Sequence, residues 1–196
     1  MRNKIISCGI VCVALIILVV FSLQCGNSGG NASVDPVKRG EYLVSVGGCN
    51  DCHTPKIMTA QGLMLDSTLF LSGHPAEEKL PDFPVDFVGP GKWGAMGSQS
   101  FTAWYGPWGV SFAANLTPDM VTGSGAWTEE SFIAAMRTGK HLGAGRGILP
   151  PMPWYNLATA TDEDLSAIFA YLKSLKPVEN MVPPPVPPSM PMSAAK

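Results

Sequence analysis

The residues with the clearest chemical potential are two cysteines and a histidine in the segment Cys49-Asn50-Asp51-Cys52-His53. This C-x-x-C-H spacing is the signature of a c-type haem attachment site. Two thiols separated by two residues reach the two vinyl groups of one porphyrin, and the histidine that follows them reaches the iron as an axial ligand. The motif therefore predicts one covalently bound haem c, attached through Cys49 and Cys52 and ligated by His53.

Two other chemistries use a C-x-x-C pair. A thioredoxin-like redox disulfide is expected beside a βαβ pattern, and the sequence shows no such pattern. A structural zinc site needs four nitrogen or sulfur ligands at short paired spacings. Outside the motif the chain offers only His74, His141 and three N-terminal cysteines, none of them in a second pair. Haem attachment therefore fits the sequence better than either alternative.

The iron also needs a second axial position, which is either filled by a side chain or open to small molecules. Among ten methionines, Met152 is distinctive because it lies in Leu149-Pro150-Pro151-Met152-Pro153-Trp154. The prolines fix the backbone, so this loop is stiff enough to present a thioether to the iron. We expect Met136 to be a core residue, and the other methionines lie on long loops or in the terminal segments. His141 is the second candidate and would give a bis-histidine haem.

The N-terminal segment has the pattern of an export signal. Arg2 and Lys4 precede an almost unbroken apolar run from Ile5 to Leu23. This pattern predicts that residues 1–24 are a signal peptide or an N-terminal membrane anchor. Because bacteria attach c-type haem outside the cytoplasmic membrane, we expect the protein in the periplasm or on the outer side of a membrane.

Cys25 closes the apolar run and resembles the lipidated cysteine of a bacterial lipoprotein, although Gln24 replaces the usual small residue. Lipid attachment at Cys25, a retained N-terminal helix and complete release all remain open. Residues 25–34 are rich in glycine and polar residues, and they predict a flexible linker.

Three helices are expected in the domain that we place at residues 35–177. Asp35-Pro36 begins the first helix, which leads into the attachment motif. A middle helix is expected from Trp127-Thr128 to Thr138-Gly139, and an amphipathic helix follows Thr161. The first and last helices are expected to cross near Gly40, opposite Tyr171, because a missing side chain permits close approach.

The motifs together resemble the monohaem class I cytochromes c, and in particular the cytochrome c domains that accompany membrane-associated dehydrogenases of bacteria. The resemblance covers residues 35–53 and 112–178. It rests on the attachment motif and on Asn115-Leu116-Thr117-Pro118-Asp119, Gly123-x-Gly125-x-Trp127-Thr128, Pro151-Met152-Pro153, Asp162-Glu163-Asp164-Leu165 and Ala170-Tyr171-Leu172-Lys173-Ser174-Leu175.

This resemblance implies a small all-α fold in which the N- and C-terminal helices pack across the haem. It also implies thioether bonds at Cys49 and Cys52 and axial ligation by His53 and Met152. In the family, a backbone carbonyl before the Asn115 block accepts the other N–H of the proximal histidine, which fixes the orientation of the ring. The residue there is usually proline, whereas this chain has Ala114.

Residues 55–112 depart from the compact family pattern. This segment is rich in glycine, proline and aromatic residues, and we expect a long loop insertion. It either wraps the porphyrin or forms a lid that shapes a partner site. The Pro-rich tail at residues 178–196 is expected to be extended and mobile, as a spacer or a docking strand.

The predicted function is electron transfer, by an electron carrier rather than an enzyme, with a dehydrogenase, an oxidase or another cytochrome as redox partner. The net charge of −2 gives no basic footprint for nucleic acid. One alternative is a haem protein with an open sixth position, which would act as a gas or redox sensor or an enzyme subunit. Another is a subunit of a dehydrogenase complex that docks through the aromatic insertion.

Overall fold

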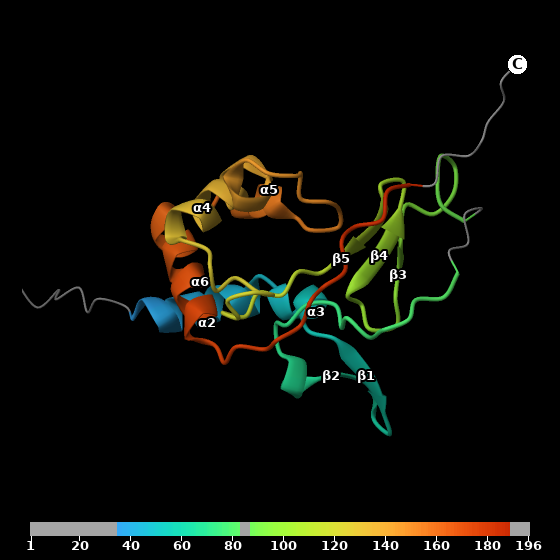
Figure 1. The fold of residues 1–196 in the computed structure, drawn as a ribbon, viewed down its shortest axis with the longest axis horizontal. Helices are drawn as coiled ribbons and strands as arrows, with labels where there is room; N and C mark the ends of the chain where they lie inside the picture. The colour runs from blue at the N-terminus through green and yellow to red at the C-terminus, as the bar shows by residue number, and fades with distance from the viewer. Residues whose placement is uncertain (1–34, 83–86, 189–196) are drawn as a thin grey trace, which may run out of the picture. The chain divides into compact units, whose positions relative to one another are not determined.

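The computed structural model describes residues 35–82 and 87–188 (Figure 1). The predicted export segment and the linker with Cys25 lie outside these residues. Within them, no helix has both the length and the apolar character needed to cross a bilayer. The helices are α2 (Pro36–Val46), α3 (Cys49–His53), α4 (Glu129–Thr138), α5 (Trp154–Leu157) and α6 (Asp162–Ser174), with 3-10 turns η1 (Ser67–Leu69) and η2 (His141–Gly143).

Helices α2 and α6 pack against each other, as predicted. The side chain of Asp35 caps α2 by accepting a hydrogen bond from the backbone N–H of Val37. Gly40 permits the close approach, because a Cβ atom there would collide with the carbonyl of Ala167 and lie 2.7 Å from the Cβ of Tyr171. The crossing expected near Gly40 and Tyr171 is therefore confirmed.

Helix α4 completes the hydrophobic core. Thr128 and Ser131 form a reciprocal capping box at its start, and Gly139 ends it with a positive φ of 64°. Met136 is buried, as predicted. The aromatic rings of Phe132 and Phe169 join α4 to α6, with their centroids 5.4 Å apart. The buried core consists of Val44, Leu71, Phe132, Ala135, Met136, Leu165, Ile168, Phe169 and Leu172.

The prediction of an all-α fold is wrong, because residues 55–112 form two antiparallel sheets. One sheet is the hairpin of β1 (Lys56–Thr59) and β2 (Gly62–Leu65), and the other has the order β3 (Met96–Gly97), β4 (Ala103–Gly106), β5 (Gly109–Phe112). The fold is therefore mixed α and β. The predicted loop insertion is instead partly regular structure.

Both hairpins have two-residue connections. Thr59 pairs with Gly62 across the first turn, and Gly106 pairs with Gly109 across the second. The φ angles of Gly62 and Gly109 are 104° and 90°, a region that glycine enters without steric cost. These glycines therefore follow the two turns and begin strands β2 and β5.

The described part of the C-terminal tail lies against the body of the domain. Val186 pairs with Val110 of β5 through two backbone hydrogen bonds of 2.8 and 3.0 Å, and the red segment runs beside β5 in Figure 1. The side chain of Asn180 donates to the carbonyls of Ser72 and His74 at 2.7 and 2.9 Å. Residues 178–188 are thus extended, as expected, and hydrogen bonds hold them against the domain.

Candidate haem site

Helix α3 carries three of the predicted site residues. It begins after Gly48, whose φ of 65° lets the chain turn out of α2. Residues three and four positions apart lie on the same face of a helix, so Cys49, Cys52 and His53 share one face. Both cysteines are free and partly exposed. Their sulfur atoms are therefore available for thioether bonds.

Lys56 fixes the end of this helix. Its Nζ donates hydrogen bonds to the carbonyls of Asp51 and Thr54, the second at 3.1 Å, which satisfies acceptors that a helix C-terminus leaves open. Burial raises the pKa of the Cys49 and Cys52 thiols above their ordinary value, and Lys56 partly offsets the effect at Cys52. The base of hairpin β1–β2 is thereby attached to the cysteine helix.

The imidazole of His53 is buried, with 8% of the residue exposed. Its Nδ1 lies 2.8 Å from the carbonyl oxygen of Ala114. Because a carbonyl only accepts, Nδ1 carries the proton and Nε2 keeps its lone pair. Burial lowers the pKa of His53, which favours this neutral form. The carbonyl contact implied by the family resemblance is present, with alanine in place of proline.

A glycine turn holds the backbone around this contact. The backbone N–H of Gly73 donates to the carbonyl of His53 at 2.8 Å, and that of His74 donates to the carbonyl of Ala113 at 2.9 Å. Gly73 has a φ of 80°, and a Cβ atom there would lie 2.7 Å from the carbonyl oxygen of Ala114. Only a residue without a side chain fits between the two segments that meet at the imidazole.

The structure buries the side chain of His74 almost completely. Its Nδ1 lies 2.8 Å from the hydroxyl of Thr102, and its ring centroid lies 4.8 Å from that of Phe112. Burial lowers its pKa, although the nearby carboxylate of Glu78 acts in the opposite direction. His74 therefore packs inside the insertion.

Met152 lies in the loop before α5, partly buried against the hydrophobic core. Two residues before it, the carbonyl of Pro150 accepts a hydrogen bond of 2.5 Å from the hydroxyl of Ser111. Ser111 belongs to β5, and Ala114 follows two residues after that strand. The segment from Ser111 to Ala114 thus contacts both the Met152 loop and His53.

His141, the second candidate for axial ligand, is exposed, and its ring packs edge-on against Trp127 with the centroids 4.8 Å apart. The guanidinium of Arg137 donates to the carbonyl of Ala158 and to the carboxylate of Asp162, both at 2.6 Å. It therefore links α4 to the start of α6.

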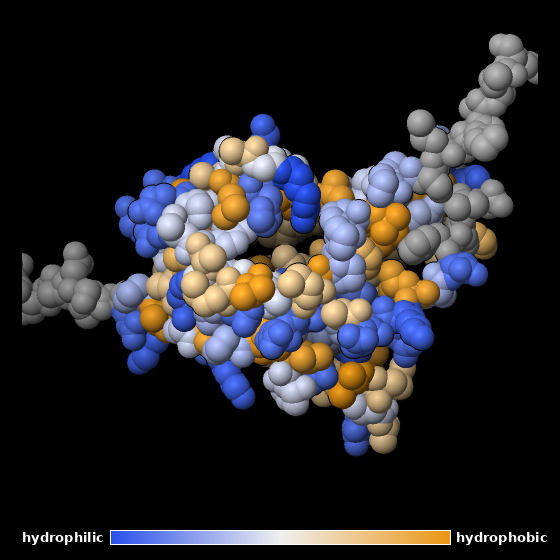
Figure 2. All heavy atoms as spheres, viewed as in Figure 1, coloured by the Kyte–Doolittle hydropathy of each residue, from blue (hydrophilic) through white to orange (hydrophobic). Residues whose placement is uncertain are grey.

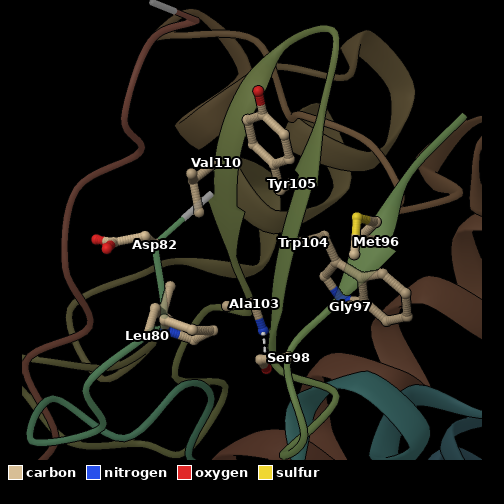
Figure 3. A pocket seen from close by; sticks show the side chains of 10 residues that line it. Leu80, Asp82, Met96, Gly97, Ser98, Ala103, Trp104, Tyr105 and Val110 are labelled. Atoms are coloured by element: carbon tan, nitrogen blue, oxygen red, sulfur yellow. Dashed lines mark hydrogen bonds between the residues drawn. The ribbon is translucent and has the colours of Figure 1, made fainter. Parts of the chain in front are cut away.

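The surface is hollowed between the α4–α5 region and α3, and apolar residues are among those around the hollow (Figure 2). The predicted donor set suits a haem. It consists of two free thiols, a buried neutral imidazole whose Nε2 has no hydrogen bond within the described residues, and a thioether in a proline-rich loop. A separate cavity of about 70 Å³ lies against the sheet of β3–β5, and none of the predicted haem residues lines it (Figure 3).

Sequence reasoning did not single out Gly73, Ser111 or Asn180. No periodic apolar pattern marks any of these three positions. The Gly73-His74-Pro75 sequence could have indicated a turn at Gly73, and Asn180 stands out as the one amide side chain in residues 178–196. Asn115, from the family motif, donates to the carbonyl of Val178 at 2.9 Å and thus helps to hold the tail.

Comparison with known proteins gives relatives among bacterial dehydrogenases, while no protein-family model matches the chain. The chain is 32% identical over 159 residues to the cytochrome c subunit of a quinone-type alcohol dehydrogenase from Gluconacetobacter polyoxogenes, covering 79% of this chain and 26% of the relative. It is 30% identical over 135 residues to the gluconate 2-dehydrogenase cytochrome c subunit from Pantoea cypripedii, covering 69% and 22%.

A third relative is a subunit of nicotinate dehydrogenase from Pseudomonas putida, with 29% identity over 154 residues, 79% of this chain and 10% of the relative. The chain therefore spans between a tenth and about a quarter of the length of these curated relatives. The resemblance inferred from the motifs, to cytochrome c domains associated with bacterial dehydrogenases, is confirmed.

Proposed function

We propose that this chain, a relative of the cytochrome c subunits of bacterial dehydrogenases, is an electron carrier that holds one haem c. Cys49 and Cys52 form the thioether bonds, and His53 and Met152 are the axial ligands. When bound, the haem supplies a centre that takes up and releases one electron between Fe(III) and Fe(II).

The hydrogen bond from Nδ1 of His53 to the carbonyl of Ala114 is the observation that carries this proposal. Such a bond fixes the tautomer, orients the ring and makes the free nitrogen a better ligand. It occurs on a buried histidine that directly follows two partly exposed thiols on the same helix face. A redox disulfide would not require this arrangement of the imidazole.

The chain's own residues keep both ligands in place and exclude water. The backbone of Gly73 and Ala114 surrounds His53, and Met152 packs against the hydrophobic core. Little nuclear movement is then needed when the charge at the iron changes. The partly exposed cysteines place one edge of the site near the surface, where a redox partner gains access.

The partner that we propose is a dehydrogenase, which delivers electrons to this chain in a respiratory pathway of the cell envelope. The relatives are named as cytochrome subunits of such enzymes. The protein is exported and works outside the cytoplasmic membrane. The protein is tethered to the membrane either by a lipid on Cys25 or by the apolar run of residues 5–23. The mass of the mature N-terminus distinguishes these two forms.

The absorption spectrum of the oxidised protein tests the ligand assignment. We expect a low-spin spectrum with the weak far-red band of methionine sulfur bound to ferric haem. Met152→Ala should abolish the band, whereas the control Met58→Ala, at an exposed methionine of β1, should retain it. A high-spin wild-type spectrum would contradict the proposal and favour a protein with an open sixth position. Loss of the low-spin spectrum in His141→Ala alone would assign the ligand to His141.

A further inference from the structure

The hydroxyl of Ser111 occupies a defined position between β5 and the Met152 loop. Ser111 is buried, with 7% of the residue exposed. The indole N–H of Trp108 donates to its Oγ at 3.2 Å. The hydroxyl proton is then directed to a carbonyl, and that of Pro150 at 2.5 Å is much nearer than that of Trp104 at 3.5 Å. The bond to Pro150 is therefore the principal one.

Apart from the packing of Met152 on the hydrophobic core, the Met152 loop has few other contacts available through hydrogen bonds. Prolines at positions 150, 151 and 153 remove three backbone donors, and the N–H of Met152 is used inside the loop, on the carbonyl of Leu149 at 3.3 Å. In the part of the chain that the structure describes, the Ser111–Pro150 bond is the hydrogen bond that joins residues 149–152 to a distant segment.

We infer that Ser111 is a positioning residue for the sixth ligand: its hydroxyl holds the Met152 loop against β5 and so slows the departure of the Met152 sulfur from the iron. This inference rests on the proposed function. The same short segment holds His53 through Ala114, so Ser111 and Ala114 fix the positions of both axial ligands. The insertion, through its last strand, thereby becomes part of the ligand support.

The rate of cyanide binding to the ferric protein tests the inference, because cyanide binds only after the Met152 sulfur has left the iron. Ser111→Ala removes the bond to Pro150 and should accelerate binding about threefold to tenfold, the effect expected for loss of one net hydrogen bond. The far-red methionine band should remain at equilibrium. Ser111→Thr, which keeps the hydroxyl on a strand, should restore a rate close to that of the wild type.

Ser100→Ala is the matched control. Ser100 belongs to the same insertion and has 6% of its surface exposed, but its hydroxyl bonds to Glu78, Ser98 and Thr102 and not to the Met152 loop. It should bind cyanide at the wild-type rate. Trp108→Phe leaves the bond to Pro150 in place and removes the N–H that orients the hydroxyl, so it should give a smaller acceleration. This second variant tests the inference if Ser111→Ala does not fold.

Equal rates of cyanide binding in Ser111→Ala and Ser100→Ala would overturn the inference and leave the proposed function intact. If Ser111→Ala does not fold, a wild-type rate in Trp108→Phe would have the same consequence. A wild type that binds cyanide as fast as Met152→Ala and lacks the methionine band would overturn both, because Met152 would not be the ligand. These two failures are therefore distinguished by the wild type alone.

Discussion

At the scale of single residues, the sequence indicated where a haem could attach and one contact that supports the site. The spacing of Cys49, Cys52 and His53 suits the reactive groups of a porphyrin, so the residue types alone carry this prediction. The replacement of proline by Ala114 did not remove the contact with His53, because the acceptor is a backbone carbonyl. The turn at Gly73 was missed because its role depends on two segments that meet only in the fold.

Gly73→Ala is expected to disturb the site through the proximal histidine. A Cβ atom at this position would lie 2.5 Å from the carbonyl oxygen of Ala113 and 2.7 Å from that of Ala114. We expect the free energy of unfolding to fall by about 1–2 kcal/mol from the positive φ alone, and further from the collision. Displacement of the Ala114 carbonyl should also shift the reduction potential. Denaturant titration and redox titration measure the two effects.

Gly62→Ala is the control for backbone strain. Gly62 also has a positive φ, of 104°, but nothing lies within 4 Å of an added Cβ atom. It should lower the free energy of unfolding without changing the reduction potential. A Gly73→Ala protein with an unchanged potential would show that the turn does not position His53.

At the scale of secondary structure, the three longer helices were predictable, whereas the short helix α5 and the strands were not. Caps and apolar periodicity located α2, α4 and α6, because each signal is local and repeats over several turns. The four-residue strands β4 and β5 are too short for a pattern of alternation to stand out, and the glycines at their turn resemble those of a loop. The all-α prediction was wrong because the helical pattern extends over several turns, whereas the alternating pattern of a four-residue strand is too short to recognise.

Gly40→Ala should weaken the packing of α2 on α6. The added Cβ atom would collide with the carbonyl of Ala167 and the Cβ of Tyr171, so one helix must move away from the other. We expect the free energy of unfolding to fall by about 3 kcal/mol, within the upper range for overpacking. Thermal or denaturant unfolding of the haem-loaded protein measures this change.

Gly94→Ala introduces the same methyl group where nothing lies within 4 Å of it. It should change the stability little. A comparable loss of stability in the two variants would show that the effect at Gly40 does not come from the helix crossing.

At the scale of the whole molecule, the tail after α6 belongs to the domain. Its proline content predicted an extended chain, and the structure agrees with that in the residues it describes. The proline content did not indicate that a single amide would make three contacts: Asn180 donates to the carbonyls of Ser72 and His74 and accepts from the N–H of Ala76 at 3.0 Å. The proline content of the tail predicts its extended backbone but not the hydrogen-bond partners of the Asn180 side chain.

Asn180→Ala should release this contact and lower the free energy of unfolding by about 2–3 kcal/mol, as expected for three hydrogen bonds of ordinary net strength. Proteolysis within the tail should also become faster. Glu179→Ala, at an exposed neighbour, is the control and should behave like the wild type. Equal protease sensitivity of the two variants would contradict a holding role for Asn180.

The Asn180 contact also has a consequence for the order of folding. It joins positions 108 and 106 residues apart in the chain, and contacts of such long sequence separation carry a high entropic cost of loop closure. We therefore expect the cysteine helix to form from local interactions first and the tail to close last. The turn that supports His53 is then completed only by residues synthesised well over a hundred positions after the histidine itself.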